Sequence, residues 1–364
     1  PAASPGYAWY VVGVLVLAQM FSFLDRMIMG LLVEPIRDSF QISDTQYSLL
    51  AGLAFTLFYA VMGLPLARIA DSRSRRNLIA VGIAAWSAMT ALCGLAKGFW
   101  SLFAARVGVG VGEATLGPAA FSMITDYFPR DVLARALSVY MAGVTLGSGL
   151  AYILGGAVVA YVQSVGDFRL PVLGPVEGWQ LTFFIVGLPG LLVALLMAAT
   201  VREPARLGLA PGDADAIPLG DAVRYVWDRR SAYGAHIFGV AIFIMVVYAL
   251  NLWGPTYFIR TFGYTSPQAG WTFGLIMIGA GAAGLLLALA LRCKSEPDTP
   301  AALADSGLLI RPARPSDDAA CKALEVSASQ FQDRLTDGRL IKFALHHYGR
   351  FDAKCAQFAD WVVL

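Results

Sequence analysis

Two charged residues inside an apolar stretch have the types and spacing for chemistry within a membrane. Arg106 and Glu113 lie in residues 100–124, a segment long enough to cross a bilayer as a helix. At about 100° per residue they share one helical stripe with Gly110 and Gly117. A charge at membrane depth costs at least about 2.5 kcal/mol, so this stripe must face a cavity, a pathway or a partner charge. A structural ion pair and a charged site in a translocation pathway are both open interpretations.

The opposite stripe of the same segment is built of small residues, which predicts that a neighbouring helix packs closely against it. Its members are Ser101, Ala105, Gly108, Gly112, Thr115 and Ala119.

The first apolar stretch carries a second pair of charges, Asp25 and Arg26. With a rise of 1.5 Å per residue, Asp25 lies about 12 Å and Arg106 about 9 Å below the outer membrane surface, which makes them plausible partners. Glu113 lies about 20 Å deep, near the midplane, where no partner is evident. Burial there favours the neutral carboxyl, and a carboxylate that gains and loses a proton can couple transport to a gradient.

The composition places the chain among polytopic membrane proteins. Of its 364 residues, 57% are hydrophobic and only 14% are charged. The predicted fold class is therefore an all-α polytopic membrane protein, with eight spans and an interruption of the seventh near Trp253-Gly254-Pro255. The spans are expected at about 9–33, 46–66, 78–96, 100–124, 134–162, 179–201, 232–259 and 269–291.

These spans predict four regions. Residues 1–201 form an N-terminal six-helix transmembrane bundle, and 202–231 form a cytoplasmic linker. Residues 232–292 supply two transmembrane helices of an incomplete C-terminal bundle, and 293–364 form a soluble cytoplasmic tail that is small α/β or disordered. Within the linker, 221–230 has the pattern of an amphipathic surface helix. Its candidate apolar contacts are Val223, Tyr225, Val226 and Trp227.

The basic residues that flank the spans predict the orientation, because cytoplasmic loops carry an excess of Lys and Arg. Thirteen lie on the side assigned to the cytoplasm: Arg68, Arg73, Arg75, Arg76, Arg130, Arg135, Arg202, Arg206, Arg224, Arg229, Arg230, Arg292 and Lys294. Four lie on the other side: Arg37, Lys97, Arg169 and Arg260. With an even number of spans, both termini are expected in the cytoplasm.

A weak internal repeat relates the second and eighth spans. Ser43-Asp44-Thr45-Gln46 precedes one, and Thr265-Ser266-Pro267-Gln268 precedes the other. Matching helix starts at corresponding places are what a parallel repeat of two bundles would give.

The loop after the second span resembles a signature of the major facilitator superfamily, Gly-x-x-x-Asp-Arg-x-Gly-Arg-Arg. Asp71, Arg75 and Arg76 match it, and the resemblance implies a cytoplasmic gating role for them. Plain topology-setting charge is an equal alternative. The departures are Ala67, Ser72 and Ser74. Arg106-x-x-x-Gly110 resembles the family's second motif, whose arginine is tied to proton coupling.

A closer resemblance is to the spinster-like branch and its bacterial members. It covers about residues 7–291 and is carried by Phe23-Leu24-Asp25-Arg26, the run 105–114, Pro118-Ala119-Ala120 and Asp126-Tyr127-Phe128-Pro129. It implies a proton-coupled symporter or antiporter for a small amphiphilic or lipid-like organic anion. It also implies that Asp25 and Glu113 couple protons, that Arg26 and Arg106 are substrate or charge-pair residues, and that the protein is a monomer in a bacterial inner membrane.

The remaining part of the chain keeps two alternatives open. The family has twelve spans in two halves, so this chain is expected to lack four spans and not to complete an alternating cavity by itself. The tail looks faintly like the start of an acyl-CoA N-acetyltransferase domain, without the turn that cradles pyrophosphate. A membrane-anchored fusion and a non-transporting fragment are therefore both open. No cofactor, metal, nucleic-acid or catalytic site is predicted, since His346-His347 and the four cysteines lack ligand spacing.

Overall fold

A computed structural model describes residues 4–166, 168–170, 174–206 and 219–295. Two compact units are distinguished, Pro1–Gly281 and Ala282–Leu364. The first unit contains every helix described below except the end of the last one. Of the second unit only 282–295 are described, so the predicted tail fold lies outside the described residues.

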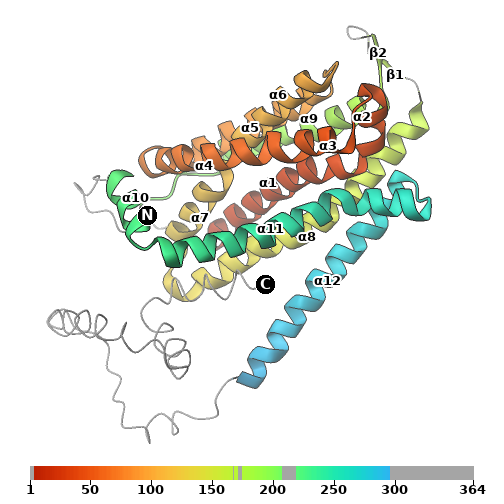
Figure 1. The fold of residues 1–364 in the computed structure, drawn as a ribbon. Coiled ribbons are helices and arrows are strands. Elements are labelled where there is room, and N and C mark those ends of the chain that lie inside the picture. Colours follow the sequence, from red (N-terminus) through yellow and green to blue (C-terminus); the bar gives the residue numbers. More distant parts are fainter. Residues whose placement is uncertain (1–3, 167, 171–173, 207–218, 296–364) are drawn as a thin grey trace, which may run out of the picture. The chain divides into compact units, whose positions relative to one another are not determined.

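Helices dominate the structure (Figure 1). The first half contains α1 (Pro5–Leu31), α2 (Val33–Phe40), α3 (Asp44–Ser48), the π-helical turn η1 (Leu49–Leu53), α4 (Ala54–Ser72), α5 (Arg75–Cys93), α6 (Phe99–Glu113), α7 (Leu116–Tyr127), α8 (Arg130–Val165) and α9 (Gly178–Thr200). Strands β1 (Phe168–Leu170) and β2 (Gly174–Val176) form a short antiparallel hairpin between α8 and α9. The second half contributes α10 (Leu219–Asp228), α11 (Arg230–Phe262) and α12 (Ser266–Ser295).

Seven segments of the described chain are long and apolar enough to cross a membrane. They correspond to the first seven predicted spans, and they confirm the all-α membrane class. The eighth predicted span lies within α12, whose side chains are described only in part. The predicted linker 202–231 contains α10 and the start of α11.

Small residues let the helices of the first half pack closely, as predicted from the stripe in the fourth span. Helix α5 packs against α6 and α9, and α1 packs against α8. A β-carbon at Gly112 would lie 2.8 Å from Cβ of Trp86, and one at Gly108 would lie 2.7 Å from Cγ of Met89. The small stripe of α6 therefore faces α5, and larger residues there would push the two helices apart.

The fourth span differs from the prediction of a single helix. It breaks at Ala114 and Thr115 into α6 and α7. The Thr115 hydroxyl donates to the Gly112 carbonyl at 2.8 Å, and Pro118, which has no N–H, occupies the first turn of α7. The helical ladder is thus interrupted directly after Glu113.

The predicted interruption near Trp253-Gly254-Pro255 is wrong, because α11 continues through Pro255. A proline in a helix leaves the carbonyl four residues earlier without its backbone donor. That carbonyl belongs to Asn251, and the Tyr152 hydroxyl of α8 donates to it. A partner from a neighbouring helix therefore replaces the missing bond, as membrane proteins require.

The two helix starts of the proposed repeat have the same local structure. Ser43 and Gln46 exchange backbone and side-chain hydrogen bonds of 2.9 and 3.2 Å in a capping box. Thr265 and Gln268 make the same pair, at 3.0 and 3.4 Å, before α12. The matching caps agree with the predicted relation between the second and eighth spans.

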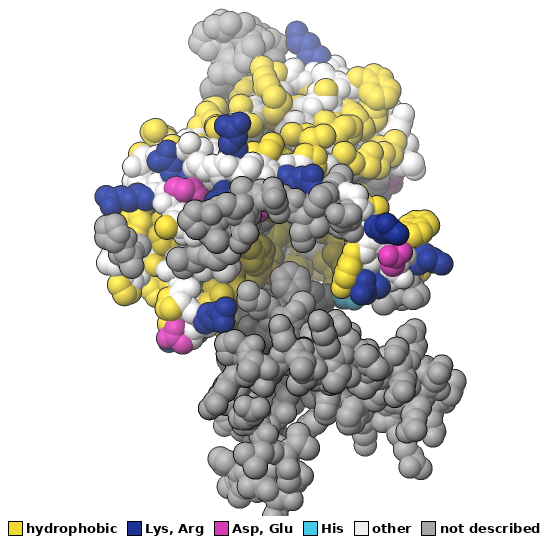
Figure 2. All heavy atoms as spheres, turned by 90° about the vertical axis from the view of Figure 1, so that its left-hand side faces the viewer, with side chains coloured by type: hydrophobic (Ala, Val, Ile, Leu, Met, Phe, Trp, Pro, Cys, Tyr) yellow, Lys and Arg dark blue, Asp and Glu magenta, His cyan; other side chains and the backbone are white. Residues whose placement is uncertain are grey.

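Charged groups gather at opposite ends of the helices. Figure 2 looks onto the end at which α4 ends and α5 begins, and several basic side chains lie around its rim. At the opposite end Arg260 of α11 binds both carboxylate oxygens of Asp44 at 2.8 and 2.9 Å, and it also binds Glu34 at 2.6 Å. Arg37 joins the same group through Glu34 and Asp44. This cluster ties the end of α11 to α2 and α3.

The basic bias generates a prediction about topology. A single cysteine introduced at Ser74 should be reached by a membrane-impermeant thiol reagent only from the cytoplasmic side, and one at Gly166 only from outside. Labelling of intact cells and of inverted vesicles checks this in a background without the native cysteines. Labelling of both positions from outside would refute the orientation.

Candidate functional site: a buried charge network beside an internal cavity

An ion pair between α1 and the end of α6 lies at the centre of the site. Arg26 places Nε and Nη2 each 2.6 Å from the same Oε2 oxygen of Glu113. Ser22, one turn before Arg26 on α1, donates its hydroxyl to that oxygen at 2.5 Å. Glu113 is 1% exposed. The expectation that Glu113 has no partner at its depth is therefore wrong.

The break after Glu113 and a close helix contact explain how this pair forms. The backbone at Gly110 lies so near α4 that a β-carbon there would be 2.5 Å from the Phe55 carbonyl oxygen. Phe55 and Tyr59 of α4 then lie beside the Arg26 guanidinium, with ring centroids 4.6 and 5.0 Å from its carbon. Aromatic faces stabilise a cation in low dielectric, so they add to the effect of the Glu113 carboxylate.

Asp25 and Arg106 meet in a different way from the predicted ion pair. Arg106 donates Nη1 to the backbone carbonyl of Asp25 at 3.3 Å, and no ion pair joins their side chains among the described residues. Asp25 is 2% exposed and Arg106 is 1% exposed. Asp25 Oδ1 and Arg106 Nε are buried without a hydrogen-bond partner in this part of the chain. The charges that act most strongly on Asp25 are those of Glu113, Arg106 and Arg26.

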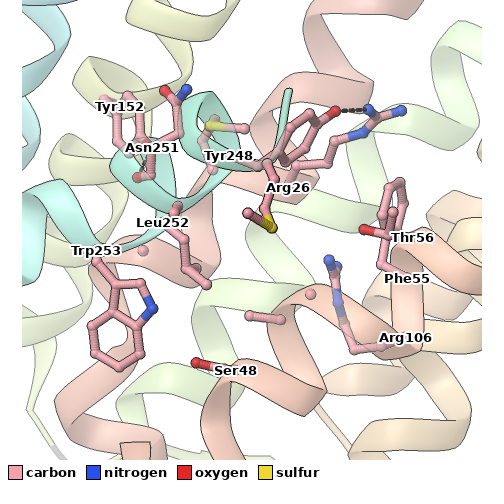
Figure 3. Close-up of a pocket in the computed structure, with 16 residues that line it drawn as sticks. Arg26, Ser48, Phe55, Thr56, Arg106, Tyr152, Tyr248, Asn251, Leu252 and Trp253 are labelled. Carbon is pink, nitrogen blue, oxygen red and sulfur yellow. Dashed lines mark hydrogen bonds between the residues drawn. The ribbon is translucent and has the colours of Figure 1, made fainter. Parts of the chain in front are cut away.

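Two cavities meet at Arg26. The larger has a volume of about 310 Å³ and lies between the first-half helices and α11, with both Arg26 and Arg106 in its wall (Figure 3). Its other lining residues include Ser48, Phe55, Thr56, Tyr152, Tyr248, Asn251, Leu252 and Trp253. The smaller, of about 180 Å³, is lined by Ser22, Arg26, Tyr59, Glu113 and Tyr140, among others. Arg26 therefore borders both the cavity that Arg106 lines and the cavity that Glu113 lines.

Arg26 also connects the two halves of the chain. Its Nη1 donates to the Tyr248 hydroxyl of α11 at 2.9 Å, the bond drawn in Figure 3. The Arg26 guanidinium thus contacts groups from four helices. It lies against the ring of Phe23 on its own helix, α1, and against the rings of α4. It also binds the Glu113 carboxylate of α6 and the Tyr248 hydroxyl of α11. A change in any of these contacts changes the position of a buried charge.

The predicted gating residues separate in the structure. Arg75 is buried and forms ion pairs with Asp126 of α7 and with Glu203 after α9, the latter at 2.8 Å. Arg76 contributes its backbone N–H to Glu203, also at 2.8 Å. Asp71 is exposed and forms none of these bonds. The cluster ties α5 to α7 and to the segment after α9, all within the first half.

The same cluster fixes the ionisation of Glu203. Partial burial would raise the pKa of Glu203, but hydrogen bonds from the Arg76 backbone and the Arg75 and Ser74 side chains outweigh it. They hold the pKa below its ordinary value.

Sequence reasoning missed several partners of these charges. Ser22 precedes Arg26 by four residues, which places both on one helix face, so it was detectable from spacing. Tyr248 and Glu203 come from segments far along the chain, and no local pattern connects them with Arg26 or Arg75. Asp126 belongs to the run Asp126-Tyr127-Phe128-Pro129, which carries part of the family resemblance, but its pairing with Arg75 was not predicted.

Membrane-crossing helices surround the buried charges and the partly open cavity of this site. A model of the Major Facilitator Superfamily matches residues 15–298. The chain therefore belongs to the Major Facilitator Superfamily, as the sequence signatures predicted, and its relatives support the spinster-like branch. The family indicates a transporter and not an enzyme.

Individual relatives agree with this assignment. An MFS-type efflux pump of Mycolicibacterium smegmatis is 30% identical over 285 residues, which are 78% of this chain and 62% of the pump. Protein spinster homolog 1 of Homo sapiens is 28% identical over 320 residues, 82% of this chain and 57% of that protein. The chain thus spans less than two thirds of the length of these relatives.

Solved structures give the same result. The crystal structure of a bacterial homolog to the human lysosomal transporter Spinster, inward-facing and unoccupied, is 34% identical, with a TM-score of 0.66 over 82% of this chain and 65% of that one. A D-xylose–proton symporter is 15% identical, with a TM-score of 0.58 over 79% of this chain and 69% of the symporter, and shows the fold alone.

The Arg75 cluster generates a prediction about stability. Arg75→Gln should lower the free energy of unfolding by about 2 kcal/mol, because it removes the charge-assisted bonds from the buried Arg75 guanidinium to Asp126 and Glu203. Arg76→Gln is the matched control, since it keeps the backbone N–H that Glu203 accepts, and it should cost under about 1 kcal/mol. Unfolding in mixed micelles measures both. Equal losses would contradict the distinction between the two arginines.

The pH dependence follows from the lowered pKa of Glu203. A carboxyl with a lowered folded-state pKa contributes stability above its unfolded value, near 4.5, and loses that contribution as the pH falls through the folded value. Glu203→Gln should therefore flatten the loss of stability below about pH 4.5.

Proposed function

We propose that this chain provides the substrate-binding cavity of a proton-coupled secondary transporter for a small amphiphilic or lipid-like organic anion. The observation that carries this proposal is Arg106, a buried guanidinium in the wall of a partly open cavity with no carboxylate in ion-pair contact among the described residues. A buried cation without a paired carboxylate favours an anionic ligand. The aromatic and aliphatic lining beside it suits an apolar chain.

The two buried carboxylates provide the proposed coupling to protons. Asp25 and Glu113 share their surroundings with Arg26 and Arg106, so the four groups together carry no net charge when all are ionised. A proton taken up by either carboxyl leaves one excess positive charge beside the cavity, which favours anion binding. Proton uptake and anion binding are then linked through one charge balance.

Alternating access would use contacts between the halves. Arg26 with Tyr248 and Arg260 with Asp44 join α11 to the first half at the cavity and at one end. In a transporter with two complete halves, such contacts form and break as one half rocks against the other. We place this protein in a bacterial inner membrane as a monomer, with Asp71, Arg75 and Arg76 at the cytoplasmic face, on the resemblance and the basic bias.

The first prediction from this proposed function tests whether Arg106 binds an anion in the chain itself. Arg106→Gln should weaken binding of oleoyl lysophosphatidic acid at least tenfold, because it removes a charge-assisted bond worth about 1.5–3 kcal/mol. Binding is measured by calorimetry in a mild non-ionic detergent at constant pH. Monooleoylglycerol, with the same chain and no charge, should bind the parent and the variant equally.

Arg135→Gln, an exposed arginine of α8, is the control and should leave both affinities unchanged. An equal loss for the charged and the uncharged lipid in Arg106→Gln would indicate a structural role and contradict the anion site.

The second prediction concerns Glu113 in a transporter that has both six-helix halves. Glu113→Gln keeps the shape and a hydrogen-bonding group but cannot ionise. It removes the charge partner of Arg26 and therefore costs stability, but in the folded protein it should reduce flux driven by a pH gradient at least tenfold more than counterflow exchange without a gradient. Asp25→Asn should act in the same direction. Both fluxes are measured side by side in proteoliposomes.

The two open interpretations of Glu113 differ in this measurement. Transport against a gradient by Glu113→Gln at the parent rate would remove the coupling role and leave the structural ion pair with Arg26. Loss of counterflow together with driven flux would indicate damaged folding, which the elution profile of the purified variant reveals separately.

A further inference from the structure

Helix α10 is not used by the proposed transport path. It lies between the first half and α11, with Arg229 as the single residue between the two helices. Val223, Val226 and Trp227 recur at the i, i+3 and i+4 spacing, so they fall on one face of α10. All three are exposed, Trp227 by 66%. The structure therefore presents an apolar helical face that no described residue covers.

The position of α10 along the chain brings this face to the membrane. The span within α11 is predicted to begin at about residue 232, five residues after Trp227. At 1.5 Å per residue, Trp227 lies about 8 Å before that point. A tryptophan at this distance from a spanning segment lies at the depth of the lipid headgroups, where its ring is most favourable.

Arginines border the apolar face. The Arg229 guanidinium carbon lies 3.8 Å from the centroid of the Tyr225 ring, and that of Arg230 lies 5.9 Å from the Trp227 ring. Arg230 also donates to the Trp227 carbonyl at 3.5 Å. Neither arginine forms an ion pair within the described part of the chain, and both are exposed. Figure 2 shows basic and hydrophobic side chains close together where α10 meets α11.

We propose that α10 is a binding surface for anionic phospholipids of the bilayer in which α11 is embedded. Val223, Val226 and Trp227 insert at the boundary between headgroups and acyl chains. Arg229 and Arg230, held against aromatic rings, contact the lipid phosphates. The surface is independent of the cavity and would fix the linker to the membrane surface, so it goes beyond the transport proposal.

Charge complementarity supports lipid as the occupant. The segment 219–230 has a net positive charge, because it contains three arginines and two aspartates. These are Arg224, Arg229 and Arg230, and Asp221 and Asp228. Each arginine near an anionic bilayer surface strengthens docking about fivefold. An apolar face bordered by arginine and aromatic residues is the pattern of an interfacial helix.

The test uses the full chain reconstituted into vesicles that contain bromine-labelled phosphatidylcholine. The quenching due to Trp227 is the difference between the parent and Trp227→Phe. We expect Trp227 to be quenched, and we expect the quenching to rise at least twofold when a quarter of the lipid is phosphatidylglycerol. The double variant Arg229→Gln with Arg230→Gln should lose most of this rise.

The matched control is Arg130→Gln with Arg135→Gln, which removes the same charge from exposed positions of α8 and should keep the rise. Four outcomes would overturn the proposal. Trp227 quenched by aqueous acrylamide instead of lipid would place α10 in water. Protection from both quenchers would indicate a protein partner. Quenching by lipid without dependence on phosphatidylglycerol, or equal losses in the two double variants, would exclude recognition of the headgroup by Arg229 and Arg230.

Discussion

The ion pair between Arg26 and Glu113 is the interaction on which the rest of the interior depends. Removing two charges from water is costly, and only close contact with additional hydrogen bonds and cation–π contacts offsets that cost. Ser22, Phe55 and Tyr59 supply those contacts from two helices. The pair therefore requires α1, α4 and α6 to approach closely, and Gly110 permits this approach. The close packing of these three helices and the pairing of the buried charges therefore depend on each other.

The same pair borders both cavities. Arg26 lies in the wall of the cavity beside Arg106 and in the wall of the cavity beside Glu113. The guanidinium is also bonded to Tyr248, so its position depends on where α11 lies. A ligand in the larger cavity, a proton on a carboxylate and a shift of α11 would all act on the same group. This shared dependence is the physical basis for linking them.

The sequence predicted the class of fold because apolar runs of spanning length and a row of small residues are local signals. It placed seven membrane-crossing segments and the face that α6 turns to α5. It could not assign the partners of the charges, because partnership depends on how helices turn about their axes. Depth along a helix suggested Asp25 for Arg106, but depth alone does not distinguish a side chain from the backbone carbonyl that Arg106 contacts. Proline was also misleading, since its missing bond at Asn251 is replaced by a hydroxyl from distant Tyr152.

That replacement has a consequence for the order in which the protein is made. A carbonyl without a donor is poorly tolerated in lipid, where no water can satisfy it. The carbonyl belongs to Asn251 of α11, whereas the donor belongs to Tyr152 of α8, which leaves the ribosome about a hundred residues earlier. When α11 enters the bilayer, the helix that satisfies its exposed carbonyl is already there. Synthesis from the N-terminus thus produces the donor helix α8 before the acceptor helix α11. In the reverse order, α11 would enter the lipid with an unsatisfied backbone carbonyl.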